Sequence, residues 1–298
     1  GGGLRRALPV LLLTLPLLAL SAQVIVVSDL EGSPVLITSD GSSPLQEDQA
    51  VPPSGRLSLG EDSRVTLREG SRKVELFRRG LFEIGELFTF RPLGKVEFEQ
   101  IFEARIKSVN LALKNGGPGS RETVIATSVL DTAENEAEQL VQGVRDLVSG
   151  RYAEARESFD AFLQSSPAEE AEAEEGPLVH LARVLAAQSA FFLDENAEAY
   201  EHLSQIRPSR GHSHYPLYLL LQAQLLIESH AFADALETLA EYLAEPSGGD
   251  ADLQTARLLT GVAYEGLGNL PVARTYYRRA TSPDPTSAAA KAARRLLE

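Results

Sequence analysis

The sequence predicts an α+β protein made of two separate domains, an all-β domain over residues 23–130 and an all-α domain over residues 131–298. Short runs of alternating apolar and polar residues, separated by Gly, Pro, Ser and Asp, predict the strands of the first domain. Apolar and small residues recur at helical spacing through the second half and predict repeated helix pairs. A third feature, an apolar stretch within residues 1–22, predicts a segment that directs export or anchors the chain.

The composition is that of a folded, acidic protein. The chain has 298 residues, of which 43% are hydrophobic and 23% charged, and this balance is typical of globular proteins. Its 42 acidic and 28 basic residues give a formal net charge of −14, which argues against nucleic acid as a partner because nucleic acid requires a basic surface. The absence of Cys excludes disulfides, thiolate nucleophiles and Cys-ligated zinc.

The N-terminal segment has the three parts of a secretory signal. Arg5 and Arg6 precede an apolar run over residues 7–20, and small residues follow at Ser21 and Ala22. The alternative is an uncleaved anchor, in which the apolar stretch continues to residue 27 and reaches about 20 residues, enough to span a bilayer. In both cases we expect the remaining chain in the periplasm or cell envelope, with a membrane contact only if the segment is retained.

The all-β domain is predicted from its strands and turns. After a first strand from Val24, strands are expected at residues 34–38, 56–59, 64–67 and 73–77. Gly and Asp in the intervening turns adopt the backbone conformations that tight hairpins need. Alternation such as that of Val65 and Leu67 with polar neighbours buries one face of each strand. No helix of useful length is expected before about residue 131.

Three stretches of this domain, residues 41–45, 51–57 and 63–70, resemble the FecR-like family in their rhythm of short strands and Gly turns. The resemblance implies a small β domain, which we expect to bind a second protein or a cell-envelope polymer. The family's founding members sense a transport event in the periplasm and signal across the membrane, so a membrane-anchored envelope sensor or regulator is the alternative function. A generic small β sandwich is the alternative fold.

The helical half contains a spaced pattern of small, aromatic and Pro residues. Its clearest copy consists of Gly261, Tyr264, Ala273, Tyr277, Ala280 and Pro285. These offsets resemble the tetratricopeptide (TPR) repeat, which implies a solenoid of stacked helix pairs. Small residues at Gly261 and Ala273 let paired helices approach, Tyr277 fills the space between them, and Pro285 stops the second helix. Three further units begin near Glu136, His180 and Pro216, and residues 287–298 are expected to form a polar capping helix.

The TPR resemblance also implies a groove lined by the first helix of each pair. It assigns to this groove Leu140, Val144, Leu147, Val184, Gln188, Phe191, Leu220, Gln224, Ile227, Leu258, Val262 and Glu265. This row is apolar with a few amide and acidic groups, so we expect it to bind an apolar segment of a protein partner. The alternative is that most of these residues are ordinary core between repeats.

No catalytic motif stands out in the sequence. The Gly-rich stretch at residues 116–120 lacks the Gly-Lys-Ser/Thr ending of a phosphate-binding loop, and neither a Gly-x-Ser-x-Gly elbow nor a His-Glu-x-x-His helix occurs. His212-Ser213-His214 reads as an exposed loop that binds a metal only if further ligands converge on it, so no metal and no cofactor are predicted. The sequence thus predicts a non-enzymatic, exported bacterial interaction scaffold or envelope assembly factor.

Overall fold

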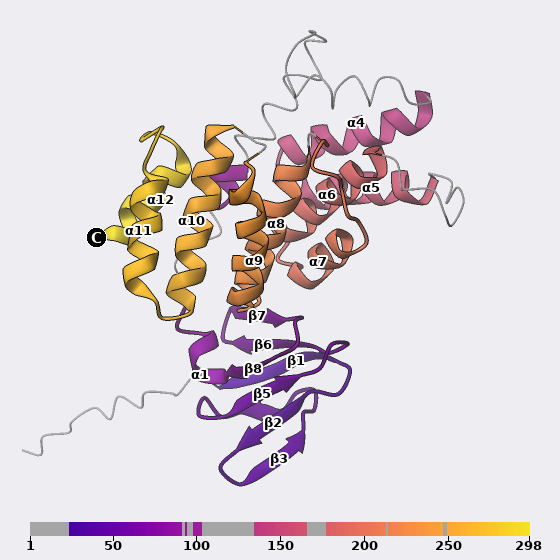
Figure 1. The fold of residues 1–298 in the computed structure, drawn as a ribbon. Helices are drawn as coiled ribbons and strands as arrows, with labels where there is room; N and C mark the ends of the chain where they lie inside the picture. The colour runs from indigo at the N-terminus through magenta and orange to yellow at the C-terminus, as the bar shows by residue number, and fades with distance from the viewer. Residues whose placement is uncertain are drawn as a thin grey trace, which may run out of the picture.

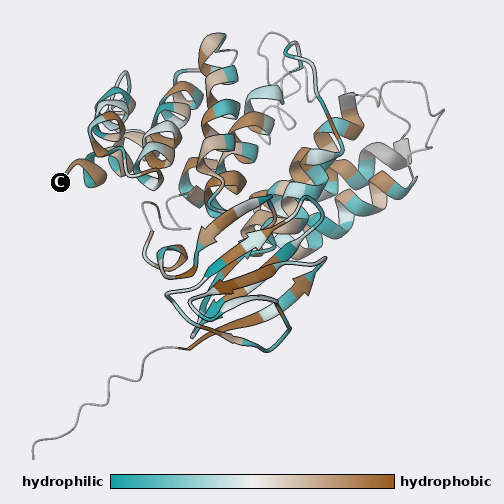
Figure 2. Ribbon diagram, turned by 60° about the horizontal axis from the view of Figure 1, so that its bottom comes forward, coloured by the Kyte–Doolittle hydropathy of each residue, from teal (hydrophilic) through white to brown (hydrophobic). Residues whose placement is uncertain are grey.

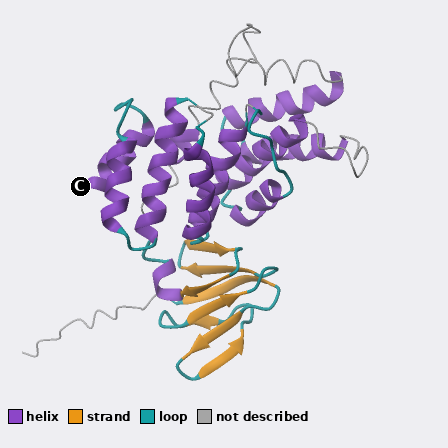
Figure 3. Ribbon diagram, in the orientation of Figure 1, coloured by secondary structure: helices purple, strands orange, loops and turns teal. Residues whose placement is uncertain are grey.

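The computed structural model describes residues 24–90, 93, 98–102, 134–165, 177–212, 214–246 and 249–298. An N-terminal β region is followed by a C-terminal helical region, and the two are segregated in space (Figures 1 and 3). This confirms the predicted α+β class. The predicted export segment at residues 1–22 and the Gly-rich stretch at 116–120 lie outside the described residues. Within the described ranges, none of the helices has the length and apolar character to cross a bilayer.

The β region is a sandwich of two four-stranded antiparallel sheets. The first sheet has the order β4(Ala50–Val51), β1(Ile25–Glu31), β6(Arg64–Glu69), β7(Arg72–Leu76). The second has the order β3(Gly41–Pro44), β2(Val35–Thr38), β5(Arg56–Leu59), β8(Gly80–Glu83). The expected strands are therefore present, and β3, β4 and β8 are added to them. Strand β3 consists of exposed residues with the sequence Gly-Ser-Ser-Pro and β4 has two residues, so neither shows an alternation of apolar and polar side chains.

The core of the sandwich comes from the inward side chains of both sheets. Val27 and Leu67 lie opposite each other on β1 and β6 and are fully buried, together with Leu57 of the second sheet. Along each strand, polar residues alternate with these apolar residues and are less buried, as in β6. The alternation of hydrophobic and hydrophilic residues along the strands is visible in Figure 2. The sequence alternation thus places one face of each strand in the core.

Among the described residues, the helical region contains four consecutive helix pairs and a C-terminal helix. The pairs are α4(Glu134–Val148) with α5(Tyr152–Ser165), α6(Pro177–Phe192) with α7(Asn196–Ser204), α8(Tyr215–Glu228) with α9(Phe232–Ala244), and α10(Asp250–Gly266) with α11(Leu270–Ala280). The first helices of successive pairs also contact one another, α4 with α6, α6 with α8 and α8 with α10. The last helix, α12(Ala288–Leu297), packs on α10 and α11 and exposes Lys291 and Arg294, as expected of a capping helix.

Small residues in the first helix of a pair face large residues in the second. A Cβ added at Gly143 would lie 2.5 Å from the ring of Phe159, and one added at Gly261 would lie 2.5 Å from the ring of Tyr277. Both rings therefore pack directly on the helix backbone, which explains the predicted need for a small residue at these positions. The two middle pairs carry smaller partners at the same sequence spacing. They are Ala187 with Leu203 and Ala223 with Leu239, all buried.

One expectation about helices is corrected by the structure. The helical turns described before residue 131, α1(Ile84–Leu87) and residues 98–102, are short and do not contradict the expectation that no helix of useful length precedes that residue. The correction concerns Pro285. Helix α11 ends at Ala280, where the Thr281 backbone N–H turns back to the carbonyls of the last turn, so the helix stops ahead of this proline.

The β sandwich docks on the helices through the edge strand β7, which lies nearest to them in Figure 1. The side chain of Arg78 forms an ion pair with Asp234 at 2.7 Å and donates a hydrogen bond to the Tyr200 hydroxyl at 3.2 Å. The ring of Phe77 stacks on that of Tyr200, with centroids 4.9 Å apart. These contacts set the orientation of the two regions.

A carboxylate of the β sandwich also caps a helix of the other region. Glu75 of β7 accepts a hydrogen bond from the backbone N–H of Ala197, in the first turn of α7, at 2.9 Å. The N-terminal N–H groups of a helix lack partners within the helix and attract a negative charge. Glu75 therefore takes the role that a capping residue of α7 itself would have, and Glu195 at the N-cap makes no side-chain capping bond.

Candidate functional site

The row assigned to a groove lies along the contacting first helices. Leu140, Val144 and Leu147 are on α4, Val184, Gln188 and Phe191 on α6, Leu220, Gln224 and Ile227 on α8, and Leu258, Val262 and Glu265 on α10. All except Glu265 are buried, and Glu265 accepts a hydrogen bond from the hydroxyl of Tyr277 at 2.6 Å. In this structure the row is interior, as in the alternative considered from the sequence.

A segment of the same chain covers part of this row. Phe98 and Phe102, one helical turn apart in residues 98–102, are 1% and 2% exposed. Both rings contact the ring of Phe191 on α6, with centroids 6.2 and 6.5 Å away and edge-on geometry, which is favourable for aromatic pairs. The segment that follows the β sandwich therefore inserts two aromatic anchors into the helical layer.

A small cavity of about 70 Å³ lies beside this aromatic seat. Its lining includes Phe98 from the segment, Gln224 of α8 and Val262 of α10. The Gln224 side chain donates to Glu228 at 2.7 Å, whereas both polar atoms of the fully buried Gln188 side chain have no hydrogen-bond partner among the described residues. The site thus combines apolar side chains with buried amides, and the cavity is also lined by Glu228 and His230.

The seat has the features of a surface that receives a short amphipathic helix. Side chains four residues apart lie on the same face of a helix, and pairs of such anchors are typical of helix-in-groove recognition. The half-buried Ile101 adds a third apolar group next to Phe102, while Gln100, between Phe98 and Ile101, is exposed. The spacing of Phe98, Ile101 and Phe102 is a signal in the sequence, but the run is too short for periodicity to predict a helix.

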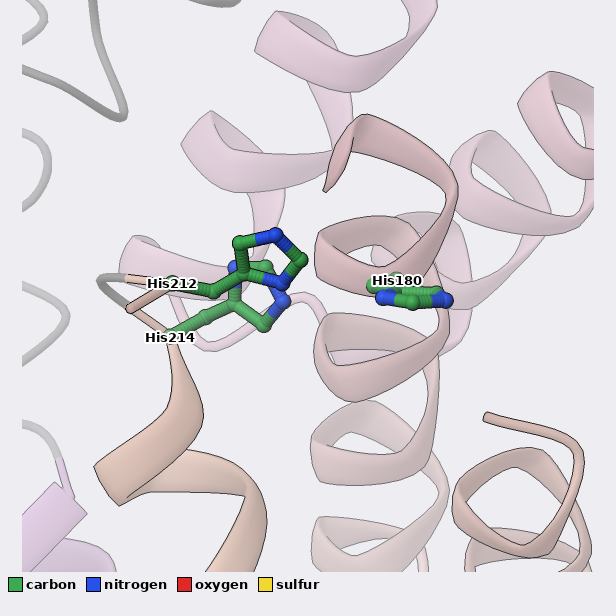
Figure 4. Close-up of side chains that lie close together, drawn as sticks. All are labelled: His180, His212 and His214. Atoms are coloured by element: carbon green, nitrogen blue, oxygen red, sulfur yellow. The ribbon is translucent and has the colours of Figure 1, made fainter. Parts of the chain in front are cut away.

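A second cluster consists of three histidines from two parts of the helical region. His180 lies in the first turn of α6, and His212 and His214 lie in the connection that leads to α8, with His214 at its N-cap. Figure 4 shows the rings of His212 and His214 side by side and directed toward α6. The ring centroids of the three residues are 5.2 to 6.2 Å apart.

The structure changes how His212-Ser213-His214 is interpreted. His214 is 3% exposed and His212 half-buried, so the two histidines do not belong to the fully exposed loop that the sequence suggested. A metal site at His212 and His214 requires a further ligand from elsewhere in the chain. His180, which is 8% exposed, lies where it can be that ligand. No local spacing links His180 to the other two, so only the packing of α6 against this connection reveals the cluster.

Comparisons with known proteins do not assign the chain to a family. No family model matches the chain, and no curated protein matches it. The fold and the two clusters described above are therefore the basis for a functional conclusion.

Proposed function

We propose that this protein is a non-enzymatic interaction scaffold whose helical region binds a short helical segment through two aromatic anchors one turn apart. The observation that carries the proposal is the seat of Phe98 and Phe102 against Phe191. A surface that accepts such a segment from its own chain has the shape and apolar character to accept a similar one from a partner protein.

The finer assignments of the sequence remain part of this proposal. Four helix pairs with a small residue facing a large one at constant spacing support a TPR-like solenoid. The short antiparallel strands support a FecR-like β domain, which serves as a second module for a protein or an envelope polymer. The signal-like sequence of residues 1–22 supports export to the periplasm or cell envelope, where the protein acts as a scaffold or assembly factor.

The proposal implies that the segment at residues 98–102 competes with a partner for the same seat. A segment tethered to its site acts at an effective concentration of about millimolar, so a free peptide at micromolar concentration is excluded from the wild-type protein. Removal of the two anchors by Phe98→Ala/Phe102→Ala leaves the seat open. A labelled peptide of residues 94–106 is then expected to bind the double variant at least about tenfold more tightly than the wild type, measured by fluorescence anisotropy.

Two controls make this experiment specific. Gln100→Ala alters an exposed residue of the same segment and is expected to exclude the peptide as the wild type does. A labelled peptide with Ala at both Phe positions should not bind the open seat. Circular dichroism checks that the double variant is folded; a folded double variant that binds neither peptide would contradict the proposed function.

A further inference from the structure

We propose that His180, His212 and His214 form a binding site for one Zn²⁺ ion, held by three imidazole nitrogens with a fourth position left for water. In the part of the chain that the structure describes, one nitrogen of each ring lies within 4.8 Å of the corresponding nitrogens of the other two. The proposal does not depend on the interaction surface discussed above, because the two clusters share no residue.

The geometry is close to that of a three-histidine zinc site. Zinc–nitrogen bonds of 2.0–2.1 Å at tetrahedral angles place the ligand nitrogens about 3.3 Å apart and the ring centroids about 5 Å apart. The observed centroid separations of 5.2, 5.7 and 6.2 Å exceed this value by up to about 1.2 Å. The ligand nitrogens lie within 4.8 Å of one another, so binding of an ion requires the rings to close by up to about 1.5 Å.

The chemistry of the donor set selects the class of metal. Imidazole suits Zn²⁺ and its first-row neighbours, whereas Mg²⁺ and Ca²⁺ require oxygen ligands. Burial of His180 and His214 shields the site from competing water, and the Nδ1 atom of His212 is buried without a hydrogen-bond partner among the described residues. An inward-facing imidazole nitrogen of this kind is available as a ligand.

Two arginines lie close to the cluster in the sequence, and one of them is paired with an acidic side chain. Arg210 forms an ion pair with Glu245, whereas Arg183 donates to the neutral amide of Gln205 and keeps its positive charge. The chain as a whole carries a formal net charge of −14. A zinc ion here would link the start of α6 to the connection between α7 and α8, and so would join the second and third helix pairs.

The test is a calorimetric titration of the full chain with Zn²⁺ after removal of metals with a chelator. We expect one Zn²⁺ per chain, a rise in the thermal unfolding midpoint with zinc because the ion binds only the folded cluster, and no binding of Mg²⁺. Co²⁺ in place of Zn²⁺ should give the visible absorption of a tetrahedral nitrogen site. A folded chain that fails to bind Zn²⁺ at this stoichiometry would overturn the proposal.

Substitutions distinguish the cluster from adventitious binding by other histidines. His180→Gln and His212→Gln should each weaken Zn²⁺ binding by more than about tenfold, since loss of even an indirect partner of a zinc site has an effect of this size. His202→Gln, which alters a histidine of α7 outside the cluster, should retain the wild-type affinity. If His180→Gln disrupts folding, His212→Gln remains as the test, because His212 is only half-buried. Wild-type affinity for Zn²⁺ in His212→Gln would rule out the site.

Discussion

The interior of the helix pairs and the junction between the two regions are held together by different kinds of contact. Inside the pairs, large apolar side chains pack on the backbone where the opposite residue has no side chain, as Phe159 does at Gly143. At the junction, an ion pair between Arg78 and Asp234 and a stacked ring pair join side chains from distant parts of the sequence. We therefore expect most of the stability to come from the pairs, and most of the sensitivity to pH and salt to come from the junction.

The helix pairs also differ among themselves in an informative way. The first and last pairs combine Gly with an aromatic ring, whereas the two middle pairs combine Ala with Leu. A larger residue on one side thus accompanies a smaller residue on the other, and all of these positions are buried. Because protein interiors tolerate changes that conserve volume better than changes of a single partner, the two solutions should be partly interchangeable.

The largest effect is expected for removal of an aromatic ring from a Gly-containing pair. Phe159→Ala should lower the free energy of unfolding by about 4 kcal/mol, because Gly143 offers no side chain to fill the space left by the ring. Leu203→Ala in a middle pair should cost about 3 kcal/mol, since Ala187 opposite keeps its methyl group. Urea denaturation of both variants measures the difference, and an equal loss would show that the two kinds of pair do not differ in packing.

Adding a methyl group at Gly261 tests the packing of the last helix pair by enlarging the small residue instead of removing the ring. Gly261→Ala should destabilise the protein by about 2 kcal/mol, because overpacking against the fixed Tyr277 ring exceeds the gain of about 1 kcal/mol that Ala brings to a helix. Tyr277 cannot move aside easily because it is buried and its hydroxyl is bonded to Glu265.

The rescue of this variant is the sharper part of the experiment. Gly261→Ala/Tyr277→Leu recreates the combination found in the middle pairs, so it should be more stable than Tyr277→Leu alone. A double-mutant cycle in urea gives the coupling energy between the two positions. A coupling energy of zero would show that the effect of residue size at position 261 does not depend on the residue at position 277.

The same comparison explains how far the sequence predicted the structure. The helix pairs were predictable because Gly261 and Tyr277 stand at a fixed local spacing, and the strands because Val65 and Leu67 alternate with polar residues. The candidate sites were not predictable to the same degree. Phe98 meets Phe191, and His180 meets His214, only through packing of elements far apart in the sequence, and no local pattern encodes such contacts.

At the junction, the expected pH effect centres on His230. Burial lowers the pKa of His230 from 6.5 to about 4, and a hydrogen bond to the Leu87 backbone opposes this shift only in part. His230 therefore binds a proton near pH 6.5 in the unfolded chain but only near pH 4 in the folded chain. The free energy of unfolding consequently falls as the pH is lowered from about 6.5 to about 4. Between about pH 7.5 and about pH 5.5 the loss should be about 1.4 kcal/mol.

Urea denaturation at several pH values, for the wild type and His230→Gln, measures this contribution. The variant cannot bind the proton, so its stability should depend less on pH across the window. Some dependence should remain, because burial also lowers the pKa of His202 in α7. The same slope in both proteins would show that His230 does not titrate in the way its burial implies.

The smallest effect is expected for the ion pair across the junction. Arg78 and Asp234 are each about two-fifths exposed, and exposed ion pairs contribute about 0.2–1 kcal/mol because solvent and salt screen them. A double-mutant cycle with Arg78→Ala and Asp234→Ala should give a coupling of about 0.5–1 kcal/mol in low salt that shrinks in high salt. The adjacent pair of Arg79 with Glu61 lies within the β sandwich and is far more exposed, so it serves as a matched control with a smaller coupling. If both pairs gave the same coupling, the position of Arg78 at the junction would carry no advantage, and the other contacts across it, such as the stacked rings and the capping bond from Glu75, would hold the two regions together.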